Sequence, residues 1–233
     1  MKSKVVILIP AFEPTDALTK LIKALRDDFF LVVVNDGSSG DFAHLFAKAE
    51  ALLKGQGTLL AHNANRGKGA ALKTGFAYIE KHCPDAVGVV TADCDGQHSL
   101  ADIRALSAQL LNSEEFLYLG VRDFKGSEVP WKSKLGNLLT CFICRTCLNL
   151  NLSDTQTGLR AIPYRILRDL QQLSGNRFEF ETQMLIQSPL PLREIPVRTI
   201  YQSRELRRTH FRTISDSLSI YRILFKAWLR RIA

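Results

Sequence analysis

Apolar, β-branched runs alternate with amphipathic segments through the first 120 residues, and this alternation constrains the fold more than any other feature. The runs typical of buried strands are 5–9, 31–34, 58–61, 86–91 and 116–120. The segments with apolar residues at helical spacing are 16–26, 42–53, 69–80 and 99–111, the last capped by Ser99. Continuous apolar strands separated by helices predict an α/β fold with a mostly parallel, doubly wound sheet.

Beyond residue 122 the alternation becomes irregular. Strands are predicted at 159–162, 193–197 and 199–201, and helices at 134–150, 164–172 and 179–187. A last segment, 211–232, repeats apolar residues at steps of three and four and predicts an amphipathic helical extension. We therefore predict one domain over 1–210, with halves 1–122 and 123–210, followed by a basic C-terminal helix over 211–233.

The composition predicts a globular, cytoplasmic protein. Hydrophobic residues make up 46% and charged residues 23% of the chain, and no apolar run reaches the roughly 18 residues of a membrane span. The N-terminal apolar stretch ends at Pro10 without a small-residue cleavage site, which favours a strand over a signal peptide. An odd number of cysteines, 5, predicts free thiols. Cys141, Cys144 and Cys147 lack a nearby His or second Cys pair, so they favour small apolar positions on one helix over a zinc site.

The basic surplus is concentrated near the C-terminus. The formal net charge is +8, and many of the arginines lie between residues 193 and 233. Such a surplus suits nucleic acid, an anionic membrane or a phosphorylated substrate. The apolar stripe of the C-terminal helix, with most basic residues off it, suits a membrane interface; packing on the protein core or on a partner is the alternative. The stripe comprises Phe211, Ile214, Leu218, Tyr221, Phe225, Trp228 and Ile232.

Ligands of parallel sheets bind where the strands end, and the sharpest motif follows the strand at 86–91. Asp93, Asp95 and Gln97 are spaced two apart, so in extended backbone their side chains point the same way. Two carboxylates and an amide oxygen suit Mg²⁺ or Mn²⁺, which keep contacts to substrate phosphates. A polar loop before the Ser99 helix is the alternative interpretation of the same residues.

Two more loops at strand ends carry weaker signals. Asn35-Asp36-Gly37-Ser38 is ordinary turn chemistry, or places Asp36 to accept hydrogen bonds from a base or ribose. Asn65-Arg66-Gly67-Lys68-Gly69 leads into a helix, where backbone amides and a lysine suit an anion. Its spacing fits neither a P-loop nor a dinucleotide-binding fingerprint.

Taken together, these motifs resemble family 2 glycosyltransferases, in the branch of dolichyl-phosphate mannose synthase and polyprenyl-phosphate sugar transferases. The resemblance covers nearly the whole chain. It is carried by residues 9–12, 34–38, 65–70, 92–98, 153–160, 177–182 and 194–197 followed by Tyr201. It implies the GT-A fold, with the half at 1–122 binding a nucleotide-diphosphate sugar and the half at 123–210 binding the acceptor.

The resemblance also implies roles for single residues. Nucleotide-sugar-binding positions are Pro10, Phe12, Asp36, Gly37, Lys68 and Asp93. Metal ligands are Asp93, Asp95 and Gln97, with Mg²⁺ or Mn²⁺ as cofactor. Catalytic positions near the transferred sugar and the acceptor are Asp95, Asp154 and Gln156. Pro14 and Asn35 depart from the family's usual acidic residues and leave the nucleotide base open.

The expected reaction is transfer with inversion, in which the metal stabilises the leaving diphosphate. A lipid phosphate acceptor such as polyprenyl phosphate, at the cytoplasmic membrane face, is already anionic and needs positioning by basic residues. Candidates for that contact are Arg122, Lys134, Arg160 and Arg212. A glycan hydroxyl would instead need a carboxylate base, for which Asp154 is the first candidate.

Other classes fit the sequence less well. A sugar nucleotidyltransferase needs a glycine-rich loop where Pro10 to Pro14 stand, and a dehydrogenase needs a dinucleotide fingerprint there. A nucleic-acid-binding protein would use the arginines but leave the carboxylates without a purpose, so no nucleic-acid partner is expected. A non-catalytic nucleotide-sugar-binding module has the same motifs and differs only in turnover.

Overall fold

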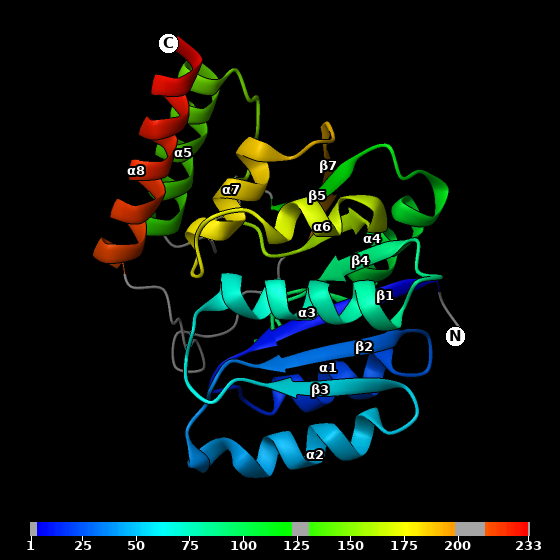
Figure 1. Cartoon of the computed structure of the whole chain (residues 1–233). Coiled ribbons are helices and arrows are strands. Elements are labelled where there is room, and N and C mark those ends of the chain that lie inside the picture. The colour runs from blue at the N-terminus through cyan, green and yellow to red at the C-terminus, as the bar shows by residue number, and fades with distance from the viewer. Residues whose placement is uncertain (1–3, 123–130, 199–212, 233) are drawn as a thin grey trace.

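A seven-stranded sheet forms the centre of the computed structural model, which describes residues 4–122, 131–198 and 213–232 (Figure 1). The spatial order of its strands is β3-β2-β1-β4-β6-β5-β7. Their bounds are β1 Val5–Ala11, β2 Phe30–Asn35, β3 Gly57–Ala61, β4 Gly88–Thr91, β5 Leu117–Arg122, β6 Arg160–Pro163 and β7 Leu192–Val197. The predicted strands at 5–9 through 193–197 are thus confirmed within a few residues, and the strand predicted at 199–201 lies outside the described residues.

One strand runs against the others. Strands β1 to β4 pair in parallel, as do β5 and β7, whereas β6 is antiparallel to both of its neighbours, β4 and β5. This reversal places Arg160, the first residue of β6, opposite Thr91, the last residue of β4. The loop that precedes β6 therefore lies at the same sheet edge as the loop that follows β4.

Helices cover both faces of the sheet, as the predicted doubly wound architecture requires. One face carries α1 Ala17–Leu25, α2 Ala43–Leu53 and α4 Leu100–Asn112, and the other carries α3 Lys68–His82, α6 Leu167–Gln171 and α7 Glu179–Gln187. Short 3-10 turns at Gly40–Phe42 and Tyr164–Ile166 precede α2 and α6. Alternate residues of β1 feed the two apolar cores: Ile7 packs into the first and Leu8 into the second. The Ser99 hydroxyl accepts the Asp102 N–H and caps α4 as predicted.

Two long helices stand side by side next to this body, on the side to which the strands β1 to β4 point (Figure 1). They are α5 Trp131–Leu148 and α8 Thr213–Ile232. A third, small apolar cluster joins them through Cys144 and Leu148 of α5 and Leu224 of α8. The predicted helix at 134–150 is confirmed within a few residues, and the one at 211–232 is confirmed from Thr213 onward, where the described residues resume. All five cysteines carry free thiols.

No helix within the described ranges is long and apolar enough to span a membrane. The predicted division of the chain at residue 210 falls within 199–212, outside the described ranges, and stays a prediction.

Candidate active site

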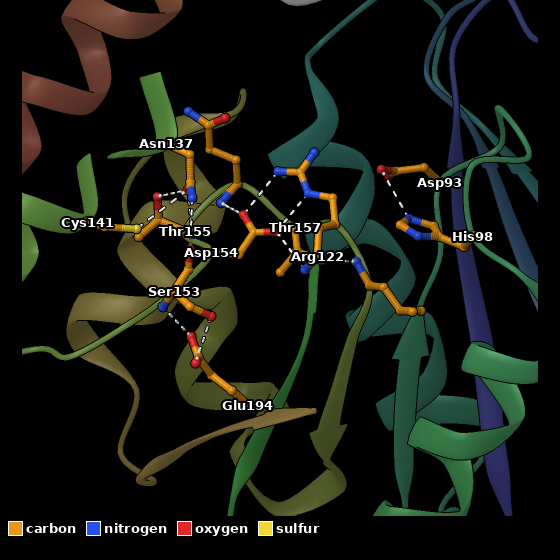
Figure 2. A network of polar contacts seen from close by, with 12 residues as sticks. Asp93, His98, Arg122, Asn137, Cys141, Ser153, Asp154, Thr155, Thr157 and Glu194 are labelled. Atoms are coloured by element: carbon orange, nitrogen blue, oxygen red, sulfur yellow. Dashed lines mark hydrogen bonds and ion pairs between the residues drawn. The ribbon is translucent and has the colours of Figure 1, made fainter. Parts of the chain in front are cut away.

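Four ionisable side chains meet where the end of β4 faces the start of α3. The Lys68 Nζ atom lies 2.7 Å from Asp93 Oδ1 and 3.0 Å from Glu181 Oε2 of α7. On the other side of the same carboxylate, His98 Nε2 lies 3.4 Å from Asp93 Oδ2 (Figure 2). The structure therefore brings together two predicted site residues, Lys68 and Asp93, with two that had no predicted role.

Two opposing effects determine the charge of each side chain in this cluster. Burial favours the neutral forms, and the attraction between the acidic and basic groups favours the charged forms. Burial disfavours the charged form of Asp93, but Lys68 and His98 hold the pKa of its carboxyl well below the usual range. Burial likewise works against the Lys68 ammonium, yet Asp93 and Glu181 raise its pKa above the ordinary value. Asp93 and Lys68 are both charged near neutral pH, so the cluster is a fixed ion-pair network.

The second carboxylate of the motif has a different environment. Asp95 Oδ1 accepts the Gln97 N–H at 3.0 Å, while burial and the nearby charge of Asp93 raise the Asp95 pKa. Between the two lies Cys94, whose thiol pKa is raised to about 12 by burial and by both carboxylates. Two carboxylates that repel one another in this way are both stabilised by a nearby cation.

Residues 93–97 fit a divalent cation as part of a shared site. Within the described ranges, no group of three or more His, Cys, Asp or Glu side chains is arranged to hold a metal. Mg²⁺ and Mn²⁺, however, are commonly held by one or two carboxylates together with substrate phosphates and water. Asp93 and Asp95 supply such a pair of hard oxygen ligands. The described contact of Gln97 is made by its backbone N–H, and a ligand role for its amide stays a prediction.

The turn after β2 fixes the loop that leads into α3. Asp36, only 3% exposed, accepts N–H groups of Arg66 at 3.0 Å and Gly67 at 2.8 Å, and its Oδ1 lies 2.7 Å from His62 Nδ1. Gly37 has φ +70°, and a Cβ there would lie 2.1 Å from the Ala64 carbonyl carbon. In the structure the Asp36 carboxylate holds this loop, and its predicted contact with the nucleoside stays a prediction.

The start of α3 is tied to the part of the chain that follows residue 122. Gly67 has φ +102°, and a Cβ on it would meet the Asn176 carbonyl oxygen at 2.4 Å. That carbonyl also accepts the Ala70 N–H at 2.9 Å. Pro10 is buried within β1, and Phe12 lies half-buried just beyond it, where its N–H bonds the Cys94 thiol. The ends of β1, β2 and β4 and the start of α3 therefore form one continuous edge.

The loop before β6 is organised around one buried carboxylate, shown in Figure 2. Asp154 has no exposed surface and pairs with Arg122 at the end of β5, with Nε–Oδ2 2.7 Å and Nη2–Oδ1 3.0 Å. Its oxygens also accept the backbone N–H groups of Arg122 at 3.3 Å and Gln156 at 2.9 Å. Each oxygen thus accepts two hydrogen bonds, which fills the four acceptor positions of a carboxylate.

Side chains from two other elements fix the same loop. Asn137 of α5 donates to the Ser153 carbonyl at 2.8 Å and accepts the Thr155 N–H at 3.0 Å. Glu194 of β7 accepts both the N–H and the hydroxyl of Ser153. Gln156 is exposed in the middle of this rigid loop. The structure therefore presents the predicted catalytic residue Gln156 to solvent and keeps Asp154 beneath it.

The four basic residues predicted to contact an acceptor phosphate have different surroundings. Arg122 pairs with Asp154, and Lys134 is exposed on α5. Arg160 is fully buried and donates to the carbonyls of Thr157 at 3.1 Å and Glu181 at 2.7 Å. Burial lowers the pKa of the Arg160 guanidinium, against the opposing effect of Glu181. Its place is thus interior, where it joins the loop to α7. Arg212 lies outside the described residues.

Sequence reasoning assigned no role to Glu181, His98, Asn137 or Glu194. Glu181 and His98 stand within motifs that the sequence does display, so their positions in those motifs were an available signal. Glu194 likewise stands within the motif at 194–197, although the Ser153 that it holds lies 41 residues away along the chain. Asn137 had no local signal, because the loop that it holds lies 16 residues away.

Three proteins of known sequence resemble this chain, and two of them are named as sugar transferases. The chain is 27% identical to an uncharacterized protein of Methanocaldococcus jannaschii, over 99% of this chain and 93% of that protein. It is 26% identical to a UDP-N-acetylglucosamine–dolichyl-phosphate N-acetylglucosaminyltransferase of Methanococcus voltae, over 87% and 88% of the two chains. It is 32% identical to an undecaprenyl-phosphate 4-deoxy-4-formamido-L-arabinose transferase of Pseudomonas fluorescens, over 44% of this chain and 31% of that protein.

Solved structures share the fold at low identity. Mannosyl-3-phosphoglycerate synthase from Rubrobacter xylanophilus matches with a TM-score of 0.69 at 13% identity, over 98% of this chain and 73% of that chain. Glucosyl-3-phosphoglycerate synthase from Mycobacterium tuberculosis, in complex with Mn²⁺, UDP and phosphoglyceric acid, matches with a TM-score of 0.63 at 18% identity, over 97% and 78%. The predicted GT-A architecture is thus confirmed. Because the family profile of glycosyl transferase family 2 matches residues 6–171, most of the chain, this protein belongs to that family.

Proposed function

We propose that this family 2 glycosyltransferase transfers a sugar, with inversion, from a nucleotide-diphosphate sugar to a lipid phosphate of the polyprenyl type. The single observation that carries the acceptor assignment is that the Asp154 carboxylate is buried and fully hydrogen-bonded. A hydroxyl acceptor needs a base with a free lone pair, whereas Asp154 is buried and accepts four hydrogen bonds. A phosphate oxygen is already anionic and reacts without such a base.

The remaining carboxylates near the site are also engaged. Asp93 and Glu181 share the Lys68 ammonium, whereas Asp95, whose pKa is raised by burial and by Asp93, would be occupied by the cation. Ion pairing of this kind lowers the basicity of a carboxylate. The acceptor must therefore react without a carboxylate base, and this requirement supports an anionic phosphate over a glycan hydroxyl.

For the donor, we propose that the diphosphate lies over Asp93, Asp95 and the start of α3. A divalent cation held by Asp93 and Asp95 would supply positive charge to the leaving nucleoside diphosphate. The Lys68 ammonium and the backbone N–H groups of the α3 N-terminus add further positive potential at the same place. Phe12, Asp36 and Gly37 would then border the nucleoside.

The transfer itself is a single displacement. An oxygen of the acceptor phosphate forms the new bond to the anomeric carbon while the bond to the nucleoside diphosphate breaks, and the leaving diphosphate takes the electron pair. Attack from the opposite side inverts the anomeric configuration. Arg122, which pairs with Asp154 of the 153–157 loop, and the exposed Lys134 would orient an acceptor phosphate.

The names of two relatives support a polyprenyl acceptor, since they are transferases to dolichyl phosphate and undecaprenyl phosphate. Such acceptors reside in membranes. We therefore place the protein at the cytoplasmic membrane face, peripherally attached with the help of the C-terminal helix.

The test is a transfer assay with a panel of UDP- and GDP-sugars, Mg²⁺ or Mn²⁺, and a short polyprenyl phosphate, with the matching polyprenol as control. Metal-dependent transfer to the phosphate alone is expected, and Asp95→Asn should abolish it. Asp27→Asn, at an exposed carboxylate far along the chain from the motif, should leave the rate unchanged. Transfer to the polyprenol or to a glycan, but not to the phosphate, would contradict the acceptor assignment.

A further inference from the structure

Exposed apolar side chains are concentrated on the two helices that stand beside the body. Every exposed large hydrophobic residue within the described ranges, apart from Leu111, lies on α5 or α8. They are Leu135, Leu138, Leu139, Phe142, Leu218, Phe225 and Leu229. Concentration of this kind on one part of a surface marks an interaction site, whereas scattered exposed apolar residues do not.

These side chains do not hold the helix pair together. Tyr221, Leu224 and Trp228 of α8 pack toward α5, so part of the stripe that the sequence predicts for the membrane is used inside the pair. Leu218 and Phe225, by contrast, are 68% and 56% exposed, and Leu138 of α5 is 64% exposed. The apolar surface therefore belongs to both helices and needs a partner outside the described chain.

The same helices are basic and carry almost no acidic side chains. The α5 sequence contains Lys132, Lys134 and Arg145 and no Asp or Glu. The α8 sequence contains four basic residues and one acidic residue, Asp216, which is 3% exposed with its Oδ1 3.7 Å from Arg177 Nε. An apolar surface on two helices that are rich in cations, and whose one carboxylate is buried, complements an anionic partner with an apolar interior.

We propose that the α5–α8 helix pair is a docking surface for the anionic phospholipid leaflet of a membrane. Association with a second copy through this surface would bring two sets of basic side chains together without acidic partners, which is unfavourable. A leaflet instead accepts Leu and Phe side chains among its acyl chains and neutralises the lysines and arginines at its headgroups.

The helix pair is joined directly to both halves of the candidate site. Asn137 of α5 holds the loop at 153–155 by its side-chain amide. Asp216 of α8 pairs with Arg177, whose Nη1 lies 3.5 Å from Asn65 Oδ1 in the loop before α3. Docking would thus fix the site relative to the leaflet. This benefit rests on the proposed function, since it matters only if the acceptor is a membrane lipid.

The experiment measures sedimentation of the full chain with vesicles of phosphatidylcholine alone or mixed with phosphatidylglycerol. Binding is expected to the mixed vesicles and to weaken with added salt. Leu138→Glu combined with Phe225→Glu should weaken binding about tenfold or more, whereas Leu111→Glu, at an apolar site on α4 that is 50% exposed, should not change it. Lys226→Gln should weaken binding about fivefold, unlike Lys20→Gln on α1.

Thermal unfolding and sedimentation velocity of each variant accompany the binding assay. Absence of wild-type binding to the mixed vesicles would overturn the inference, as would equal losses in the Leu111 variant. A wild-type dimer that the double variant dissociates would assign the surface to a second copy and also overturn it. Wild-type vesicle binding without transfer to polyprenyl phosphate would instead leave the docking surface standing and refute the proposed function.

Discussion

Gly158 lies against the ion-pair cluster of the candidate site, and its replacement by alanine tests whether that cluster is a tightly fitted unit. A Cβ at this position would lie 2.4 Å from Asp93 Oδ2, 2.8 Å from Asp93 Oδ1 and 2.8 Å from Lys68 Nζ. The backbone cannot retreat easily, because the Gly158 carbonyl accepts the Thr91 hydroxyl at 2.7 Å and β6 begins two residues later.

The structure sets the size of the expected effect. Contacts below 3.0 Å require movement of the Asp93 carboxylate or of the Lys68 ammonium, which are bonded to one another. Overpacking of a fitted site costs about 1–3 kcal/mol, which corresponds to roughly 2–4 °C in Tm per kcal/mol for a chain of this size. Displacement of a positioned catalytic carboxylate by about 1 Å lowers turnover about 100-fold. Gly158→Ala should therefore reduce transfer much more than stability.

The assay compares urea unfolding with transfer rates over a range of Mg²⁺ or Mn²⁺ concentrations. Gly40→Ala is the matched control, because a Cβ there meets no atom within 4 Å. The expected result is a large loss of kcat/KM and a higher metal requirement in the Gly158 variant alone. Wild-type turnover with an unchanged metal requirement would refute the reasoning that Asp93 and Lys68 must keep their present positions.

Three other predictions concern charge and reactivity. Arg122→Leu leaves a buried carboxylate unpaired and should lower the free energy of unfolding by about 3–5 kcal/mol, whereas Arg104→Leu, which breaks an exposed pair, should cost less than about 1 kcal/mol; similar losses in urea unfolding would contradict this. With metal chelated, the stability that wild type holds over Lys68→Met should be greatest between pH 3.8 and 10.5. It should shrink as pH falls through the lowered pKa of Asp93, and as pH rises through the raised pKa of Lys68; a flat difference from pH 3 to 11 would refute the pairing. With its thiol pKa raised to about 12, Cys94 should react slowly with iodoacetamide at pH 8 until the chain unfolds, as mass spectrometry would show; rapid native labelling would contradict the raised pKa.

Local patterns were sufficient for the elements and for the placement of the Asp93 and Asp95 motif at the end of β4. The strand that ends at Thr91 and the motif at Asp93 and Asp95 could be found because periodicity and strand-end placement are local properties. The direction of β6 could not, since a short apolar run fits either orientation. Its reversal brings Gly158 beside Asp93, which no spacing in the sequence indicates.

Long-range partners explain the rest of the difference. Asp154 was a candidate base because it matches a family position near the acceptor. Its pairing in the interior depends on Arg122, which comes from a strand 32 residues earlier. The C-terminal stripe likewise has the period of one amphipathic face. The packing of α5 decides which of its residues remain exposed. Trp228 packs in the cluster between α5 and α8, whereas Phe225 is exposed.

The reversed strand β6 also has a mechanical consequence. It pairs with β4 on one side and with β5 on the other, so the segment after residue 122 is inserted into the middle of the sheet formed by the first half. A hinge between the two halves would have to break backbone ladders in the centre of the molecule. The protein therefore cannot open and close as two lobes around its substrates. Donor and acceptor must therefore bind at the edge of a rigid sheet. Any opening and closing around them must come from loops and side chains at that edge.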